Sequence, residues 1–347
     1  MALKRLDSQK DIADYQDVKG RLFSATHDEI LAGWTTDIYF LKTRDVLRSA
    51  GRLDAMVTAE IFARGDGVFS GSEEVLNLLR TLPNPPRTES LKEGSAFKAK
   101  EVLMRLTGSY ESFGLYEAVM LGMLASATGW ATAARQCVEA ADGRPVLCFG
   151  ARHVHPAIAP VMERSAKIAG CSAMSCILAA KLCGEEPKGT VPHAAVLIVG
   201  DTVKLAKFYD AQIPADEPRT ILIDTFKDES EEAIRVAEAL GDRLASVRLD
   251  TPGERGGVTP DLVREIRWRL DHAGYEKVRI VATGGITPDR IRILNEAGAD
   301  IYGVGSYITH GTQRDMTMDI KMVDGKPIAK RGRLPGIVPN PRLERVI

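Results

Sequence analysis

Between residues 278 and 308, short apolar runs alternate with glycine-rich breaks and one helical stretch. The β-branched run 278–282 predicts a buried strand, and Thr-Gly-Gly at 283–285 interrupts it. The next residues carry apolar side chains at helical spacing up to Gly298, and Gly-Val-Gly-Ser at 303–306 ends a second short strand. The pattern predicts strand, glycine loop, helix, strand and glycine loop in succession.

The same alternation extends through the middle of the chain. Strands are predicted at 146–149, 171–175, 220–224 and 246–250, and helices after Pro156 and at 177–182, 194–208, 231–240 and 259–272. Regular alternation of this kind indicates parallel strands joined by crossover helices, and an α/β barrel is the expected closed form.

The first part of the chain contains helical and strand patterns without this regular alternation. Helices are predicted from Thr36 or Asp37 to Leu47 and at 73–79 and 116–141, and strands at 56–62 and 102–106. Near the C-terminus, 318–323 and 326–330 flank the turn pair Asp324-Gly325 and predict a hairpin. We therefore expect an N-terminal α+β domain of residues 1–115 that is completed by 311–347, and a barrel domain of residues 116–310.

Composition narrows the class of protein. The 347 residues are 44% hydrophobic, and 46 basic against 47 acidic side chains favour neither nucleic acid nor an anionic membrane as a partner. No apolar run approaches the ~18 residues of a membrane span, and residues 1–16 lack the apolar core of a signal peptide. Five cysteines without a C-x-x-C pair are typical of reduced thiols and fit no zinc pattern, so a cytoplasmic protein is expected.

Candidate chemistry lies where the predicted strands end, because barrel enzymes build their active sites at that edge. The residues singled out are Phe149, Arg152, Asp224, Arg248, Asp250, Thr283, Gly284, Gly285, Gly303, Gly305 and Ser306, with His193 ahead of the long apolar helix. Each has a simpler explanation: the glycines as turn residues, the aspartates as helix caps, Arg248 as a surface ion pair, and His193 as an N-cap. Their shared position at strand-to-helix junctions favours a common site.

Such a set suits substitution on a polyphosphorylated sugar. Glycine loops let backbone N–H groups approach a phosphate closely. Carboxylates hold ribose hydroxyls and Mg²⁺, and the arginines neutralise a leaving pyrophosphate or an acidic base. Phe149 offers a face on which a flat ring stacks.

In order and spacing, several segments resemble the nicotinate phosphoribosyltransferase family. They are TDIY at 36–39, KEGSAFKAKEVLMRLTGSY at 92–110, FGAR at 149–152, GTVPHA at 189–194, VRLDTP at 247–252, ATGGI at 282–286 and YGVGS at 302–306. The resemblance implies the irregular α/β barrel of type II phosphoribosyltransferases beside an α+β domain built from both chain ends. It also implies an enzyme of NAD biosynthesis that joins nicotinate to phosphoribosyl pyrophosphate, giving nicotinate mononucleotide and pyrophosphate.

The resemblance also implies a role for each matching residue. Phe149 would stack on the pyridine ring, Arg152 would contact phosphates, and Arg248 with Asp250 would face the ring and the ribose. Asp224 would lie near the Mg²⁺–pyrophosphate, with Asp250 as a second carboxylate for the metal. The loops of Thr283, Gly284 and Gly285 and of Gly303, Gly305 and Ser306 would hold the 5-phosphate.

Two further implications concern the assembly and the energy source, and one residue departs from the family pattern. Asp37 and Tyr39 match a motif that reaches into the neighbouring subunit's site, which implies a homodimer with shared active sites. His193 matches a histidine that is phosphorylated by ATP, so ATP is expected as a co-substrate. His153 stands where many relatives carry a second arginine, which removes a permanent charge from the pocket.

Other functions compete with this interpretation. A quinolinate enzyme resembles the family in its barrel, but its R-K-T-x-P-G segment is absent. A nicotinamide enzyme carries an aspartate where Ser172 falls, so Ser172 is expected near the substrate and favours an acidic ring. A phosphate-binding barrel that is not a transferase would need the glycine loops but neither His193 nor the TDIY motif.

Overall fold

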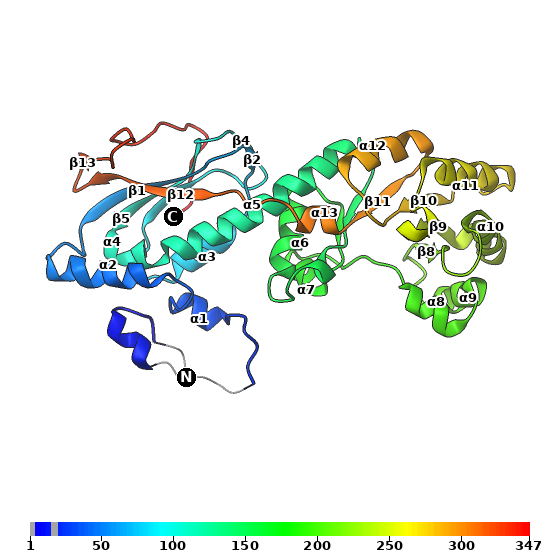
Figure 1. The fold of residues 1–347 in the computed structure, drawn as a ribbon, viewed down its shortest axis with the longest axis horizontal. Coiled ribbons are helices and arrows are strands. Elements are labelled where there is room, and N and C mark those ends of the chain that lie inside the picture. Colours follow the sequence, from blue (N-terminus) through cyan, green and yellow to red (C-terminus); the bar gives the residue numbers. More distant parts are fainter. Residues whose placement is uncertain (1–3, 15–19) are drawn as a thin grey trace. The chain divides into compact units, whose positions relative to one another are not determined.

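The computed structural model describes residues 4–14 and 20–347. The chain divides into two compact units, residues 1–132 with 312–347 and residues 133–311 (Figure 1). Both chain ends therefore belong to the first unit. The division falls inside helix α5 (Glu117–Ala140), whereas we expected it before this helix, at 115/116.

The first unit is built on a six-stranded antiparallel sheet with the order β13-β12-β1-β5-β3-β14. Its strands are β1 (Met56–Ala63), β3 (Arg87–Ser90), β5 (Val102–Ser109), β12 (Met316–Val323), β13 (Lys326–Pro327) and β14 (Glu344–Arg345). A separate pair consists of β2 (Gly67–Val68) and β4 (Ala96–Phe97). The helices are α1 (His27–Leu31), α2 (Ile38–Ser49), α3 (Ser72–Arg80) and α4 (Tyr110–Phe113), with 3-10 turns at Gln9–Asp14 and Gly114–Tyr116.

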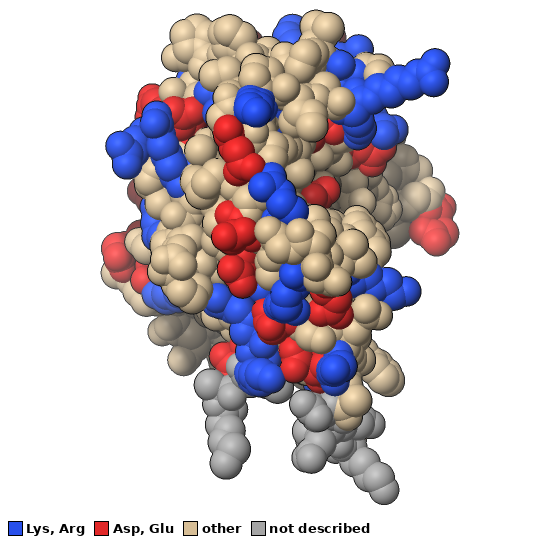
Figure 2. Space-filling view, turned by 90° about the vertical axis from the view of Figure 1, so that its left-hand side faces the viewer, with Lys and Arg blue, Asp and Glu red and all other residues tan. Residues whose placement is uncertain are grey.

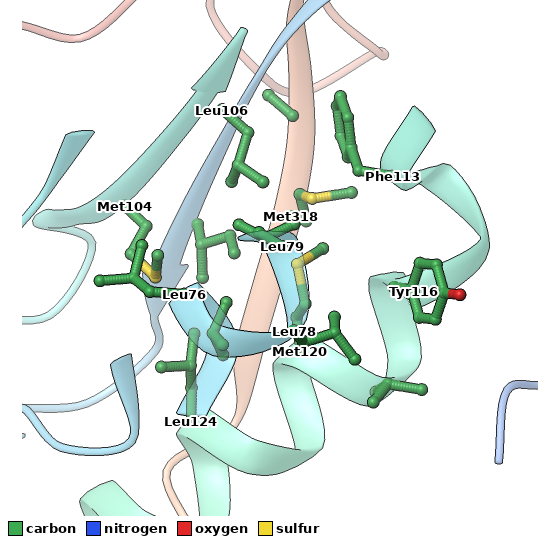
Figure 3. Packing of buried hydrophobic residues seen from close by; sticks show 14 of the residues in the cluster. Leu76, Leu78, Leu79, Met104, Leu106, Phe113, Tyr116, Met120, Leu124 and Met318 are labelled. Atoms are coloured by element: carbon green, nitrogen blue, oxygen red, sulfur yellow. The ribbon is translucent and has the colours of Figure 1, made fainter. Parts of the chain in front are cut away.

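Alternation along these strands gives the sheet one apolar face that packs on α3 and on the first turns of α5. Figure 3 shows this packing, with Leu76 and Leu79 from α3, Met104 and Leu106 from β5, Met120 and Leu124 from α5, and Met318 from β12. All seven are buried. Burying a side chain of this size contributes about 1.5–3 kcal/mol, so the cluster holds strands from both ends of the chain in one sheet.

The C-terminal hairpin turns at Asp324 and Gly325, whose φ angles are 47° and 76°. Positive φ at both turn residues matches the right-handed twist of the flanking strands. The Asp324 carboxylate also accepts a hydrogen bond from the backbone N–H of Met56, at 3.1 Å. β12 pairs with β1 along its length, but the return strand β13 has only two residues and ends at Pro327, which has no N–H to donate.

The second unit contains a parallel sheet with the order β7-β6-β11-β10-β9-β8. Its strands are β6 (Val146–Cys148), β7 (Ala173–Met174), β8 (Arg219–Leu222), β9 (Leu244–Leu249), β10 (Arg279–Ala282) and β11 (Ile301–Val304). The helices are α6 (Ala159–Ile168), α7 (Ile177–Leu182), α8 (His193–Val199), α9 (Thr202–Gln212), α10 (Glu229–Leu240), α11 (Pro260–His272), α12 (Pro288–Ala297) and α13 (Ser306–Thr309), with 3-10 turns at Ala151–His153, Gly241–Arg243 and Gly253–Arg255. The expected α/β fold is confirmed. Because β7 and β8 form two edges, the sheet is a curled half-barrel.

The apolar stretch 194–208, which we predicted to be mainly one helix, forms two helices. Gly200 ends α8 with a φ of 85°, a conformation that favours glycine. Asp201 then begins α9, because its carboxylate accepts a hydrogen bond from the backbone N–H of Lys204 at 2.8 Å. Apolar composition alone does not reveal this break.

The distribution of charged side chains on the surface agrees with the near-neutral net charge of −1. On the face drawn in Figure 2, basic and acidic side chains are interspersed. Among residues 4–14 and 20–347, no helix is both long enough and apolar enough to cross a membrane. The segment 1–16, which we interpreted as lacking a signal-peptide core, lies partly outside the described residues.

Candidate active site

A cavity of about 410 Å³ opens in the second unit at the carboxyl ends of its parallel strands. This is the edge at which open α/β sheets and barrels commonly bind ligands. The sequence-predicted residues that line the cavity are Phe149, Arg152, His193, Arg248, Asp250, Thr283, Gly284, Gly285, Gly303, Gly305 and Ser306. Residues at the carboxyl ends of four strands, β6, β9, β10 and β11, and at the start of α8 therefore converge on one space.

Arg248, the next-to-last residue of β9, lies at the centre of the polar contacts. Its guanidinium donates to the hydroxyls of Thr190 at 2.8 Å and Thr283 at 3.1 Å, and to the Asp250 carboxylate at 3.0 Å. Its central carbon also lies 5.6 Å from the centre of the Phe149 ring, a cation–π distance. Only 16% of the Arg248 side chain is exposed, and its hydrogen bonds fix it in the cavity wall, so it is not a surface ion pair.

The glycine loops that follow β10 and β11 need glycine for two different reasons. Gly284 and Gly285 have φ angles of 82° and 62°, which favour a residue without a Cβ. At Gly303, an added Cβ would lie 2.6 Å from the Phe149 ring and 2.6 Å from the Thr283 methyl group. At Gly305, it would lie 2.9 Å from the Phe149 carbonyl oxygen. Both loops thus bring bare backbone to the cavity wall, where an anion could approach it.

His193 and Asp224 form a pair, with Nε2 of the ring 3.0 Å from Oδ2 of the carboxylate. The Asp224 side chain is fully buried, and burial raises its pKa while the hydrogen bond to His193 opposes that shift. Within the described part of the chain, its second oxygen Oδ1 and the neighbouring hydroxyl of Thr225 have no hydrogen-bond partner. A buried polar atom without a partner costs about 1–3 kcal/mol, which a bound ligand could offset.

None of these residues serves as the helix cap that we considered as an alternative. The N-cap of α10 is Asp228, the N-cap of the turn after Asp250 is Pro252, and the N-cap of α8 is Pro192. His193 is the first residue of α8 instead, and its side chain is 39% exposed on the cavity wall.

Arg152 and His153 lie together in the turn that follows β6, and both are exposed. The Arg152 Nε and the His153 Nε2 are 3.5 Å apart. Burial lowers the pKa of His153, and the charges of Arg152 and His310 lower it further. The ring is therefore held towards its neutral form, and Arg152 is the permanent charge of this loop.

The structure does not bring every predicted site residue to the cavity wall. The side chain of Asp224 is fully buried and does not line the cavity, although it bonds to His193, which does. Ser172 is exposed and precedes β7, so it lies at the amino end of that strand. Ser175, which follows β7, lines the cavity instead, as does Thr190, and sequence reasoning singled out neither. Ser172 was singled out from its match to a position in nicotinamide enzymes and not from strand geometry. The strand itself is shorter than the expected 171–175, because β7 contains only Ala173 and Met174.

Asp37 and Tyr39 lie in the first unit, at the start of α2. Asp37 is the N-cap of this helix, but its side chain makes no capping hydrogen bond. The Tyr39 side chain is 53% exposed, and the pKa of its phenol is raised by burial and by the charges of Glu117 and Asp37. Both side chains are thus presented on the surface of this unit.

No cluster of three or more His, Cys, Asp or Glu side chains that could hold a metal ion occurs within the described ranges. All five cysteines fall within these ranges and are free, and three of them, Cys137, Cys148 and Cys171, are buried. A metal ion in the cavity would therefore depend on substrate oxygens for most of its ligands.

Two family models match the chain in succession and together cover most of it. The quinolinate phosphoribosyl transferase N-terminal domain matches residues 37–128, and the C-terminal domain of the same family matches residues 130–319. A solved structure of nicotinate-nucleotide pyrophosphorylase from Pyrococcus furiosus is 42% identical, with a TM-score of 0.86, over 91% of this chain and 82% of that one.

Two relatives show how closely neighbouring families resemble one another. Nicotinate phosphoribosyltransferase pncB1 of Mycobacterium tuberculosis is 30% identical over 86% of this chain and 75% of that protein. A probable carboxylating nicotinate-nucleotide pyrophosphorylase of Archaeoglobus fulgidus is 26% identical over 73% of this chain and 90% of that protein.

These matches correct the function that we inferred from the motifs. The assignment to the nicotinate phosphoribosyltransferase family, with nicotinate as the substrate, was wrong, because both family models are of quinolinate phosphoribosyl transferase. ATP as a co-substrate and an ATP-coupled ligase were wrong for the same reason, since that family does not use ATP. The phosphohistidine role of His193 depended on ATP and is withdrawn with it. The motifs misled us because the glycine loops and the strand-end residues serve phosphoribosyl transfer in general.

Proposed function

Because the chain belongs to the quinolinate phosphoribosyl transferase family, we propose that it transfers the phosphoribosyl group of phosphoribosyl pyrophosphate to quinolinate. The products would be nicotinate mononucleotide, pyrophosphate and carbon dioxide, in the biosynthesis of NAD. The observation that carries this proposal is the match of both family domains to a chain whose strand-end loops meet at one cavity.

The residues of the cavity support separate roles in binding the 5-phosphate, the pyridine ring and the ring carboxylates. The loops at Gly284-Gly285 and Gly303 would hold the 5-phosphate through backbone N–H groups. Phe149 would stack on the pyridine ring, and Arg248 would neutralise a ring carboxylate from its place over Phe149. Since quinolinate carries two carboxylates, the exposed guanidinium of Arg152 would neutralise the second, or the pyrophosphate beside it.

The carboxylates suit the ribose and the leaving group. Asp250 lies beside Gly284 and would accept hydrogen bonds from ribose hydroxyls. Asp224 has a buried oxygen without a partner among the described residues, which fits a Mg²⁺-bound water or a ribose hydroxyl. Mg²⁺ carried in by the pyrophosphate would neutralise its developing charge. Asp250 would be the carboxylate on the cavity wall that faces it, and the buried Asp224 would add its charge from beside His193.

We further propose that the active protein is a homodimer in which each first unit completes the partner's site. Ile38 and Tyr39 at the start of α2 are 45% and 53% exposed, and Asp37 has no capping bond to lose. Exposed aromatic and apolar side chains of this kind are typical of contact surfaces.

The test is to supply phosphoribosyl pyrophosphate and Mg²⁺ with quinolinate, nicotinate or nicotinamide in parallel, with no ATP present. We expect nicotinate mononucleotide and carbon dioxide from quinolinate alone, in equal amounts, and no added product when ATP is supplied. An Arg248→Ala variant that melts like the wild type should lose the reaction. Product from nicotinate without release of carbon dioxide would refute quinolinate as the substrate.

A further inference from the structure

A buried carboxylate underneath the cavity joins two of its loops. Glu163 is the fifth residue of α6 and is fully buried. Its Oε1 accepts hydrogen bonds from the backbone N–H of Ala151 at 3.2 Å and from the hydroxyl of Ser175 at 2.7 Å. Its Oε2 accepts a hydrogen bond from the backbone N–H of Cys176 at 2.7 Å.

The three donors come from two loops that are far apart in sequence. Ala151 belongs to the turn after β6, next to Arg152, whereas Ser175 and Cys176 follow β7. Taking a carboxylate out of water is unfavourable unless hydrogen bonds satisfy both of its oxygens. The site thus requires both loops to keep their places around Glu163.

The packing around Glu163 leaves the first loop little freedom to move. A Cβ added at Gly150 would lie 2.5 Å from the Cε of Met162, the neighbour of Glu163 in α6, and 2.8 Å from the Thr309 methyl group. The backbone of the loop therefore rests directly on α6. A shift of Arg152 along the cavity wall would require Ala151 to leave the Glu163 carboxylate.

We propose that Glu163 is a positioning residue for substrate binding, which fixes the Arg152 loop and the Ser175 loop relative to each other. The hydroxyl hydrogen of Ser175 is committed to Glu163, so Ser175 presents only lone pairs to the cavity. It therefore accepts a hydrogen bond from a ligand hydroxyl, such as one on the ribose, and does not donate to a phosphate. The identity of the ligand rests on the proposed function, but the coupling of the two loops does not.

The variant Glu163→Gln tests the coupling. Glutamine can accept on one oxygen only, because its amide nitrogen is a donor. Whichever way the side chain points, one of the two loops therefore loses its backbone hydrogen bond to residue 163: Cys176 if the oxygen replaces Oε1, and Ala151 if it replaces Oε2. The matched control is Glu232→Gln. Glu232 is also fully buried, but it pairs with Arg235 in its own helix α10, and Arg235 does not line the cavity.

Hydrogen exchange measured by mass spectrometry reads the loops directly and needs no substrate. In Glu163→Gln, the amide of Ala151 or of Cys176, or both, should exchange about 10-fold faster than in the wild type, the equivalent of one lost hydrogen bond. Glu232→Gln should leave both amides unchanged. Wild-type exchange at both amides in a folded Glu163→Gln protein would overturn the proposal.

Kinetics separate positioning from a general loss of stability. We expect Glu163→Gln to lower kcat/KM on the order of 10-fold or more, mainly through KM, with a melting temperature no lower than that of Glu232→Gln. An unchanged kcat/KM would overturn the proposal. If Glu163→Gln does not fold, Ser175→Ala keeps the carboxylate and must still speed exchange at Cys176, and unchanged exchange there overturns the proposal. A wild-type protein that is inactive towards quinolinate would refute the proposed function and leave the exchange test valid.

Discussion

At the scale of single residues, the ring of Phe149 and the guanidinium of Arg248 form the part of the cavity that suits a flat, acidic ligand. Stacking on an aromatic face contributes about 0.5–1.5 kcal/mol beyond the area that it buries. We expect Phe149→Ala to raise the KM for the pyridine about 2- to 10-fold and to leave the KM for phosphoribosyl pyrophosphate less affected. Phe208→Ala, which removes an exposed ring from α9, is the control. An unchanged KM in a folded Phe149→Ala protein would place the ring elsewhere.

Asp224 offers a second test at this scale, because its pKa is raised mainly by burial. A raised pKa means that the folded protein disfavours the ionised carboxylate. The resulting loss of folding stability is complete above the pKa of the folded state and absent below the pKa of the unfolded state. Asp224→Asn removes the penalty at neutral pH. We therefore expect an equal or higher melting temperature, but a kcat lower on the order of 100-fold, because the charge is lost where pyrophosphate leaves.

Asp228→Asn is the matched control for Asp224→Asn. Asp228 is the N-cap of α10, and its carboxylate accepts a hydrogen bond from the backbone N–H of Ser230 at 3.0 Å. Unlike Asp224, its carboxylate bonds to no residue that lines the cavity, so the variant should keep its activity and lose at most about 1 kcal/mol of stability. An Asp224→Asn protein that melts early yet stays active would show a structural role for Asp224.

Glu117, the first residue of α5, supplies a pH test. Burial, and next the charge of Asp319, raise the pKa of this carboxyl to about 7, while Lys330 opposes the shift. The folded protein therefore holds a proton that the unfolded chain releases, and stability falls as the pH rises from about 4.5 to about 7. At about 1.4 kcal/mol per pKa unit, the penalty above this range is on the order of 1–3 kcal/mol.

We accordingly expect Glu117→Gln to raise the melting temperature above pH 7 and to change it little near pH 5. Glu73→Gln, at an exposed position of α3, should show no such difference between the two conditions. Melting curves followed by circular dichroism suffice for the comparison. Equal effects of Glu117→Gln at both pH values would mean that Glu117 keeps one protonation state in both conditions, which would contradict a pKa of about 7.

At the scale of elements, the end of β11 tests how tightly the strand-end loops are packed. A Cβ at position 303 would lie 2.6 Å from both Phe149 and Thr283, so Gly303→Ala forces the ring or the loop to move. Overpacking of this kind costs about 1–3 kcal/mol, and we expect lower stability together with a higher KM for the pyridine. Gly253→Ala is the control, because nothing lies within 4 Å of its added Cβ. Wild-type kinetics in Gly303→Ala would show that the ring does not depend on this wall.

At the scale of the whole molecule, the proposed shared site predicts complementation between two inactive proteins. Tyr39→Ala alters the first unit and Asp250→Asn alters the second, so a mixed dimer would contain one intact site. Mixing the two variants under conditions of subunit exchange should restore activity, up to about a quarter of the wild-type value for random pairing. No recovery after confirmed exchange would contradict the placement of Tyr39 in the partner's site.

Local patterns were enough to find most elements of the fold. The predicted helix 177–182 matches α7 residue for residue, and 278–282 and 259–272 differ from β10 and α11 by a single residue at one end. The helix that we predicted to end at Gly298 is α12, where apolar residues at helical spacing precede a clear stop signal, since Gly298 has a φ of 100°. The strand predicted at 171–175 has no such stop signal. It ends at Met174, so Ser175, and not Ser172, lies at the cavity.

The sequence by itself determined the α/β class of the second unit, the glycine loops, and a set of strand-end residues that the structure gathers around one cavity, because these depend on local spacing and on where a strand stops. Only the tertiary structure decided which polar groups are paired. The contacts of Arg248 with Thr190, of His193 with Asp224, and of Glu163 with two loops join residues 12 to 58 positions apart. Hydrogen bonds between such distant positions form when packed elements bring them together, so the pattern of neighbouring residues in the sequence does not predict them.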